Sequence, residues 1–454
     1  MRMTPPVKSC ENAPYLYLTQ WFPPEPAGVP YALLEAMEEL GIPIQVVTGI
    51  PNYPSGNVAS GYRPWKRYRE MAQSTRLLRV PLFPSHSDSS TGRIVNYASF
   101  ALTSTLFAWP LLRQSPGVVL YGSPVTAGLL PMLGKLLFGI PYLVLVEDLW
   151  PDSLQDSNIA PQGFMGRKLV DVAGWFSDLI YRNANFLVAI TDGMARELRA
   201  RGYEHEQVGV VMNWAEHEFA APVEPTGRLR ELLNLDESEF VLLYAGNIGS
   251  THELPNWIKA VTEIKDGPSV SLVFIGDGAA RQELENLAGD LGSACVHFLD
   301  RVDDEDFLPL YADADVLVVS LRRDSGLQTA MPSKIPTALA SGKIILASLD
   351  GDAADAVRRG GGFVSTDGSA AAIKEMIQNF LRESTEERKA RAWQAISYYS
   401  MAMSRERGKQ QLLRSFESAF GPFRSNGTRQ VSPGVAGHQA SKASDCVPRA
   451  GADA

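Results

Sequence analysis

The sequence predicts an α/β fold with two doubly wound domains, and three observations support this prediction. Short apolar runs rich in β-branched residues recur along the chain and alternate with segments of helical period. Their near-continuous apolar character is typical of parallel strands that are covered on both faces of the sheet. The chain, at 454 residues, is also too long for one ordinary core. We therefore expect two domains that face each other across a cleft.

The apolar runs fall into two series, separated by a proline-rich stretch. The first series comprises residues 15–19, 44–48, 118–121, 142–147 and 186–190. The second begins at 240–245 and continues through VSLVFIG, CVHFL, DVLVVS, KIILAS and GFVS. The stretch AAPVEPTG (220–227) between them has the composition of a linker.

This pattern predicts four parts. We expect a first domain over 1–222, a second over 223–394, helices over 395–420 that return to the first domain, and a disordered tail over 421–454. The tail is predicted because its residues are small and polar and lack apolar periodicity.

Composition excludes several classes of protein. The cysteines, Cys10, Cys295 and Cys446, are odd in number and widely spaced, which argues against a disulfide framework and a zinc site. A net charge of −9 argues against a nucleic-acid partner. The first residues lack the apolar core of a secretory signal, so we expect a cytoplasmic protein.

Glycine-rich loops follow two strands of the second series. Gly246 and Gly249 come directly after 240–245, and Gly276 and Gly278 end the next strand. In open α/β sheets, ligands bind beyond the carboxyl ends of the strands, where glycine lets backbone amides approach a phosphate. Each loop taken singly is better explained as an ordinary tight turn, because glycine is common after strands.

The stretch MPSKIPTALASGK predicts a short helix that carries a positive charge at its start. Ser333 is a suitable N-cap, Pro336 is tolerated in the first turn, and Gly342 is a plausible stop. Lys334 would add a full charge to the partial positive charge of the helix N-terminus, which suits an anion. The alternative is a solvated lysine at a helix end.

The order of these motifs resembles the donor domain of family 4 glycosyltransferases, which have the GT-B architecture of two Rossmann-like domains. It includes GNIG, VFIGDG, FLDRVDDEDFLPLYADADVLVVS, PSKIPTALASGK and DGDAADAV, over nearly the whole second half. In the first half LTQWFPPEPAG, VEDLWPDSL, VAITDGM and VVMNWAEHEF resemble the bacterial branch that builds capsules, exopolysaccharides and O-antigens, including colanic-acid-type transferases.

The resemblance implies retaining transfer of a sugar from a nucleotide-diphosphate donor to an acceptor hydroxyl, with no cofactor and no required metal. Lys334 would stabilise the charge that develops on the leaving diphosphate. The base would contact the strand end at Asp300, Arg301 and Val302. The residues implied in donor binding are Gly246, Asn247, Gly249, Arg301, Val302, Thr329, Ser333 and Thr337.

Some positions depart from the family pattern. Thr329 and Thr337 stand where many members have two glutamates, Asn247 stands where an arginine is frequent, and a nearby lysine is replaced around His252. Divergence within an active branch is one interpretation. The alternative is a catalytically silent protein that binds a nucleotide sugar or a partner transferase.

Acceptor-side signals are fewer. Gly28 lies between the first strand and the first helix, where the family places a glycine loop near the acceptor, although a flexible turn explains it equally. Glu147 and Asp148 end another strand, and we assign them a catalytic role as hydrogen-bond partners of a sugar. The alternative is an acidic cap on the following turn.

Two stretches predict peripheral binding to the inner face of the cell membrane. Residues 94–112 carry no charge, but Asn96 and Pro110 favour an interfacial or core helix over a spanning one. In GYRPWKRYRE, cationic and aromatic residues alternate in a way that suits anionic headgroups or a lipid diphosphate, although a charged surface loop is equally compatible. The residues predicted to face the membrane are Arg63, Trp65, Lys66 and Arg67. The implied acceptor is polyprenyl-diphosphate-linked or a polysaccharide.

Overall fold

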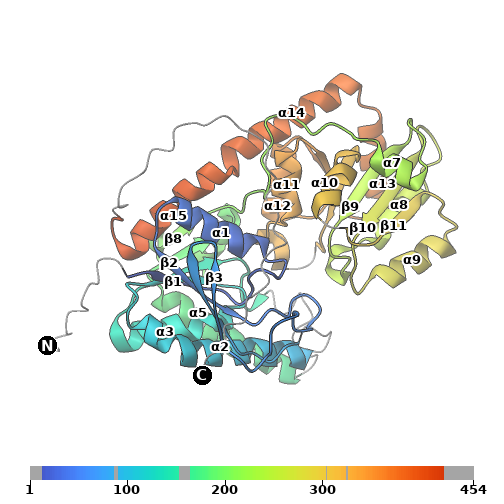
Figure 1. Cartoon of the computed structure of the whole chain (residues 1–454). Helices are drawn as coiled ribbons and strands as arrows, with labels where there is room; N and C mark the ends of the chain where they lie inside the picture. The colour runs from blue at the N-terminus through green and yellow to red at the C-terminus, as the bar shows by residue number, and fades with distance from the viewer. Residues whose placement is uncertain (1–12, 86–89, 153–163, 303, 324–325, 424–454) are drawn as a thin grey trace. The chain divides into compact units, whose positions relative to one another are not determined.

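The computed structural model describes residues 13–85, 90–152, 164–302, 304–323 and 326–423 (Figure 1). The chain divides into two compact units, one formed by 1–142 with 420–454 and the other by 143–419. The strands belong to two sheets, of eight and six strands. The predicted tail lies almost entirely outside the described residues, and the predicted domain boundaries stay a prediction.

Unit 1 contains five strands in the order β3-β4-β2-β1-β5. All neighbouring pairs are parallel except β3 with β4 at the edge. The strands are β1 (Tyr15–Leu18), β2 (Ile44–Gly49), β3 (Tyr68–Ala72), β4 (Thr75–Val80) and β5 (Val118–Tyr121). The helices are α1 (Gly28–Glu39), α2 (Ser90–Leu112), the 3₁₀ helix η1 (Val125–Gly128) and α3 (Leu129–Phe138).

Unit 2 begins with the parallel strands β6-β7-β8 and then forms the whole six-stranded sheet. The first strands are β6 (Tyr142–Val146), β7 (Phe186–Ala189) and β8 (Val208–Val210). Their helices are α5 (Phe164–Asn183), α6 (Asp192–Ala200) and the short η2 (His205–Gln207).

The six-stranded sheet is parallel throughout, in the order β11-β10-β9-β12-β13-β14. Its strands are β9 (Phe240–Ala245), β10 (Val270–Ile275), β11 (Val296–Leu299), β12 (Val316–Ser320), β13 (Ile344–Ser348) and β14 (Phe363–Val364). The elements between the strands are α7 (Arg228–Leu233), η3 (Ser250–His252), α8 (Pro255–Thr262), α9 (Arg281–Asp290), α10 (Asp304–Ala312), η4 (Gly326–Thr329), α11 (Lys334–Ala340) and α12 (Gly351–Arg359).

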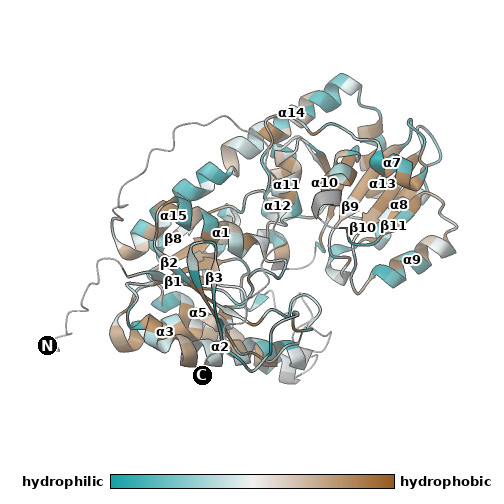
Figure 2. Ribbon diagram, in the orientation of Figure 1, coloured by the Kyte–Doolittle hydropathy of each residue, from teal (hydrophilic) through white to brown (hydrophobic). Residues whose placement is uncertain are grey.

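The predicted α/β fold class is confirmed. Strands and helices alternate along the chain, and the strands form two largely parallel sheets. Figure 2 shows the apolar character of the strands of the second sheet, whose core also includes Trp257 and Phe380. Three strands were not predicted. β4 was missed because Arg76 and Arg79 interrupt its apolar pattern, and β3 and β8 lie at edges where apolar runs are short.

The described part of the chain ends in helices, as the sequence predicted. They are α13 (Ala370–Leu381), α14 (Thr385–Ala402), which begins with a capping box at Ser384, and α15 (Arg405–Phe420). α14 packs against α11, and the Phe420 ring lies 5.0 Å from that of Tyr15 in unit 1.

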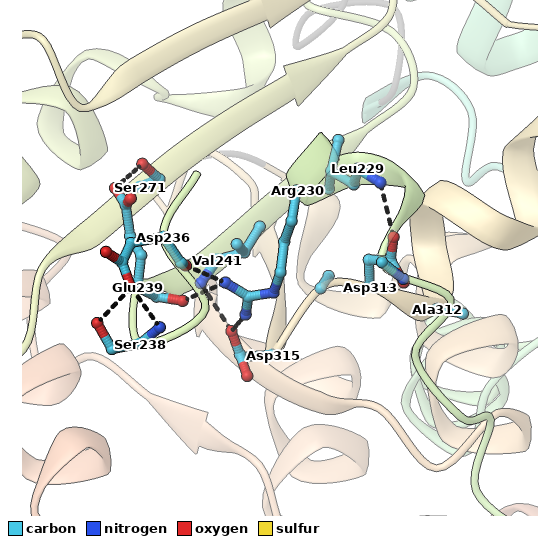
Figure 3. Close-up of polar contacts among 12 residues, drawn as sticks. Leu229, Arg230, Asp236, Ser238, Glu239, Val241, Ser271, Ala312, Asp313 and Asp315 are labelled. Carbon is cyan, nitrogen blue, oxygen red and sulfur yellow. Dashed lines mark hydrogen bonds and ion pairs between the residues drawn. The ribbon is translucent and has the colours of Figure 1, made fainter. Parts of the chain in front are cut away.

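The amino-terminal ends of β9 and β12 are held by charged side chains (Figure 3). Asp313 accepts backbone hydrogen bonds at the start of α7, including one of 2.6 Å from Leu229. Arg230 donates to the carboxylate of Asp315 at 3.0 Å and to the carbonyl of Glu239 at 2.7 Å. These bonds attach the segment that precedes β9 to the sheet, at the end opposite to the glycine loops.

Candidate functional site

The two glycine loops at the carboxyl ends of β9 and β10 lie backbone against backbone. The Gly246 amide donates to the carbonyl of Ile275 at 2.8 Å. A β-carbon on Gly276, whose φ is +141°, would lie 2.1 Å from the carbonyl oxygen of Gly246. A β-carbon on Gly278 would lie 2.4 Å from that of Ile248. These two positions therefore require glycine for both conformation and space.

Lys334 extends from the start of α11 over the first of these loops. Its Nζ lies 3.5 Å from the centroid of the Tyr244 ring, a cation–π contact. A β-carbon on Gly246 would lie 2.9 Å from Lys334 Cε, so the glycine leaves the room that the lysine occupies. The structure thus brings together two residues that the sequence assigned to one phosphate site.

In the described part of the chain, no oxygen lies close enough to hold the Lys334 ammonium. Among the residues that the structure describes, none offers it a hydrogen-bond acceptor or a carboxylate, and its contact is the Tyr244 ring. Burial lowers the pKa of Lys334 to about 7. The alternative of a solvated lysine at a helix end is less consistent with this burial, and the phosphate role assigned to Lys334 stays a prediction.

The helix that begins at Lys334 differs in one detail from the expectation. Ser333 occupies the N-cap position, but its side chain is exposed and makes no capping hydrogen bond. Its backbone is already helical, with φ −57° and ψ −21°, and this differs from the extended conformation that a capping serine adopts. The start of α11 is set instead by the burial of Ile335 and Pro336.

Two aromatic residues belong to this site and were not predicted as parts of it. Tyr244, in β9, donates its hydroxyl to the Asn247 carbonyl at 2.6 Å and so fixes the glycine loop. The His252 ring lies 6.0 Å from that of Tyr244, with Nδ1 3.2 Å from the Gly249 carbonyl. Burial, and then the charge of Lys334, lower the pKa of His252 to about 4. The signal for Tyr244 was its place just before the glycines, in a strand otherwise aliphatic at its centre.

The remaining predicted donor residues lie in different surroundings. The Thr337 hydroxyl donates to the Ser333 carbonyl at 3.2 Å, within α11. The Thr329 carbonyl accepts a 2.9 Å hydrogen bond from the Thr191 hydroxyl. Arg301 is exposed and Val302 is partly exposed just after β11, and their contact with a base stays a prediction.

Asp300 forms an ion pair with Arg281, with 2.8 Å between the carboxylate and the guanidinium, although the Asp300 side chain is 92% exposed. Arg281 also donates to the Gly276 carbonyl at 2.9 Å. This arginine therefore links the carboxyl ends of β10 and β11.

Glu147 follows β6 directly, as predicted, and has a partner that the sequence did not reveal. The Asn213 amide donates to its carboxylate at 3.0 Å. Burial, reinforced by the charge of Asp148, raises the pKa of Glu147 to about 7. The group can therefore accept or donate a hydrogen bond near neutral pH.

Gly28, on the acceptor side, is the first residue of α1 and is exposed. No atom lies within 4 Å of the position of its missing β-carbon. The glycine is therefore not needed for space within the chain.

The four residues predicted to face a membrane are all exposed, and Trp65 is 73% exposed. Lys66 lies over the Tyr68 ring, and the guanidinium of Arg67 lies 4.6 Å from the centroid of the Phe107 ring in α2. The segment is a loop up to Arg67, after which β3 begins. No helix in the described ranges is long and apolar enough to cross a bilayer. Nor do those ranges hold a cluster of three or more His, Cys, Asp or Glu suited to a metal ion.

Glycine loops and a covered lysine at the carboxyl ends of parallel strands are typical of α/β proteins that bind anionic, phosphate-bearing ligands. Comparison with known families makes this class specific. Residues 226–397 match the model of the glycosyl transferases group 1, and 28–214 match that of the glycosyl transferase 4-like domain. The chain belongs to the family 4 glycosyltransferases with the GT-B architecture, and is a glycosyltransferase.

Relatives and solved structures agree with this assignment. The chain is 26% identical over 331 residues to WcaI of Escherichia coli, assigned to colanic acid biosynthesis as a glycosyl transferase, covering 71% of this chain and 79% of WcaI. It resembles Anabaena HepE, solved with UDP and glucose, with a TM-score of 0.63 and 17% identity over 89% of this chain and 99% of HepE. It also resembles WaaG, a glycosyltransferase involved in lipopolysaccharide biosynthesis, with a TM-score of 0.58 and 17% identity over 87% of this chain and 98% of WaaG.

Proposed function

We propose that the enzyme transfers a sugar, with retention of configuration, from a nucleotide-diphosphate sugar to a hydroxyl of a lipid-linked or polysaccharide acceptor during synthesis of a bacterial surface polysaccharide. The names of WcaI and WaaG support the pathway, and the UDP and glucose in the HepE structure support the donor class. No metal is required in this proposal.

One observation carries the donor assignment: Lys334 is a desolvated lysine with no anionic partner among the described residues, and it lies where two strands end in glycine loops. A diphosphate placed there would raise the lysine pKa and gain a charge-assisted hydrogen bond. The leaving diphosphate gains negative charge as the bond from sugar to phosphate breaks. Lys334 therefore stabilises the transition state more than the ground state.

The acceptor oxygen forms the new bond to the anomeric carbon as the diphosphate departs. The departing phosphate oxygen takes the acceptor proton, so the chain itself need not provide a base. Glu147 and Asp148 contact sugar hydroxyls in this proposal, and the near-neutral pKa of Glu147 lets it serve as donor or acceptor.

Thermal unfolding in the presence of UDP, GDP and their sugars tests the donor assignment. A nucleotide at about 100 times its dissociation constant should stabilise the fold by about 2.7 kcal/mol. We expect one base to stabilise the protein with its diphosphate and to lose most of the effect as the monophosphate. Equal shifts for nucleoside, monophosphate and diphosphate would contradict a diphosphate site.

We further propose that unit 1 binds the inner membrane surface, where a lipid-linked acceptor is presented. Trp65 beside Lys66 and Arg67 is the supporting observation, because a protruding indole flanked by cations suits the interface of an anionic bilayer. In α2, Leu106 is also 68% exposed. Arg67 reaches the ring that follows it, Phe107, so loop and helix lie together.

Co-sedimentation with vesicles that contain an anionic phospholipid tests this location. We expect binding that falls when salt is raised, since headgroup attraction is screened over a Debye length. The variant Trp65→Ser should bind less, whereas Trp393→Ser, at another exposed tryptophan on α14, should not. Equal binding by all three proteins would contradict the assigned face.

A further inference from the structure

Three pairs of adjacent residues in unit 1 repeat one pattern, an amide followed by an aromatic ring. They are Gln20–Trp21 after β1, Asn52–Tyr53 after β2, and Asn96–Tyr97 near the start of α2. The first two pairs lie at the carboxyl ends of neighbouring parallel strands. In α/β folds that edge is where ligands bind.

The three amides form a buried cluster. The Gln20 amide nitrogen donates to the Asn96 side-chain oxygen, and Asn96 donates to Asn52 Oδ1 at 3.2 Å and to the carbonyl of Phe83 at 2.7 Å. Each of the three amide side chains is at most 4% exposed. Gln20 Oε1 is left without a donor in the described residues. Burying three amide side chains costs more free energy than filling the same space with apolar side chains. This cost favours a role for the cluster in positioning the residues next to it.

The three rings gather around Trp21. Its centroid lies 5.6 Å from that of Tyr53 and 6.2 Å from that of Tyr97, at tilted and edge-on angles. Tyr97 is buried, but Trp21 and Tyr53 remain partly exposed. Two aromatic side chains are thus held at a ligand-binding edge with part of their surface open.

A buried carboxylate sets the relative position of the two exposed rings. Glu25 accepts hydrogen bonds from the amides of Asn52 and Tyr53, at 2.7 and 2.8 Å, and from that of Phe22, the neighbour of Trp21, at 3.1 Å. The side chain is 6% exposed. It therefore joins the loop after β1 to the loop after β2, which preorganises the pair of rings.

We propose that Trp21 and Tyr53 form a stacking platform for a pyranose ring of the acceptor. This proposal rests on the proposed function and adds to it the acceptor contact. The C–H face of a pyranose is apolar while its rim is polar, which matches aromatic faces in a site with a few placed polar groups. Glu25 and the amide cluster are positioning residues, since they hold the rings and need not touch the sugar.

Saturation-transfer NMR with the methyl glycosides of glucose, galactose, mannose, fucose and N-acetylglucosamine tests the platform. We expect at least one glycoside to receive saturation through its ring C–H protons in the wild type. Trp21→Ala and Tyr53→Ala should each weaken its binding about tenfold, the order expected for one lost aromatic contact. Trp21→Phe should retain most of the binding, and Trp393→Ala is the matched control.

The same samples are measured for thermal shift by UDP and GDP, which separates the two proposals. Unchanged nucleotide shifts together with lost glycoside binding in Trp21→Ala support the platform. Equal glycoside binding in Trp21→Ala, or no glycoside signal from the wild type, overturns it even if the nucleotide shifts stand. Farnesyl phosphate serves as a lipid probe: its binding, if it depends on Trp21 while no glycoside binds, assigns the rings to a lipid instead. Absence of any nucleotide shift counts against the proposed function alone.

Discussion

Lys334 and Lys343 lie at opposite ends of the same short helix, and their surroundings differ. Lys343, just after α11, donates hydrogen bonds to the carbonyls of Ala312 and Ala314, the latter at 2.7 Å. Lys334, at the start of α11, lies over the face of Tyr244 and has no hydrogen-bond acceptor among the described residues. Burial lowers the pKa of both, to about 8 for Lys343 and about 7 for Lys334.

The contrast separates a lysine with structural hydrogen bonds from one to which we assign a ligand in the proposed function. A buried ammonium with two acceptors completes the fold at the amino-terminal ends of the strands, where Asp313 and Asp315 also act. A buried ammonium without a hydrogen-bond acceptor is electrostatically unfavourable, and a bound anion would compensate its charge. Sequence alone does not distinguish them, because both are lysines that flank one apolar helix.

The largest effect is expected from Lys334→Ala. If Lys334 stabilises the leaving diphosphate, turnover with the donor should fall about 10²–10³-fold, the range for loss of one preorganised group at a developing charge. Initial rates of sugar transfer, or of slow donor hydrolysis, measure this change. Thr337→Glu in the same background should not restore the rate, because a carboxylate cannot supply the positive charge that Lys334 provided.

A matched result is needed from an exposed cation at the same sheet. Arg358→Ala, on α12 and paired with Asp355, should keep wild-type turnover. Wild-type turnover in Lys334→Ala would contradict the phosphate-binding role of Lys334. It would also contradict the functional difference that we draw between Lys334 and Lys343.

Lys343→Met should affect stability and spare chemistry. The substitution leaves the carbonyls of Ala312 and Ala314 without their donor, which costs about 1–3 kcal/mol of unfolding free energy. Urea denaturation measures the loss, and activity per folded molecule should remain. A tenfold loss of activity without loss of stability would contradict the structural role that we assign to Lys343.

A smaller effect is expected in the pH dependence of stability. The pKa of Lys334 is about 7 in the folded chain and about 10.4 when unfolded, so the unfolded chain binds more protons between these values. Stability from this group therefore rises with pH across that window. Lys334→Met lacks this ionisable group. The variant should therefore be more stable than wild type near pH 6.5, and the stabilities of the two proteins should converge near pH 10. Parallel stability curves for the two proteins would contradict the lowered pKa.

Much of the fold was predictable because parallel strands buried on both faces leave continuous apolar runs. β9 and β5 match the predicted runs residue for residue. β4 was not predictable in this way, since Arg79 is buried and pairs with Glu70 of the antiparallel edge strand. In a sequence pattern, an arginine predicts an exposed position, and its burial can be inferred only when its acidic partner is known.

The site was predictable where neighbours in sequence carry it and not where the fold assembles it. The glycines and Lys334 follow from motif order, whereas the placement of Lys334 over Tyr244 depends on the pairing of β9 with β12. Glu147 was predicted from its strand end, but Asn213, 66 residues away, was not. Burial and pKa are properties of such distant contacts.

Calorimetric titration with the nucleoside diphosphate that stabilises the protein tests the central claim most directly. At pH 8 a free Lys334 with a pKa of about 7 is mostly neutral, and a bound diphosphate would restore its charge. Binding heats in buffers of different ionisation enthalpy should therefore show uptake of most of one proton by the wild type and none by Lys334→Met, with weaker binding by the variant. Equal affinity and equal proton uptake in the two proteins would contradict the account.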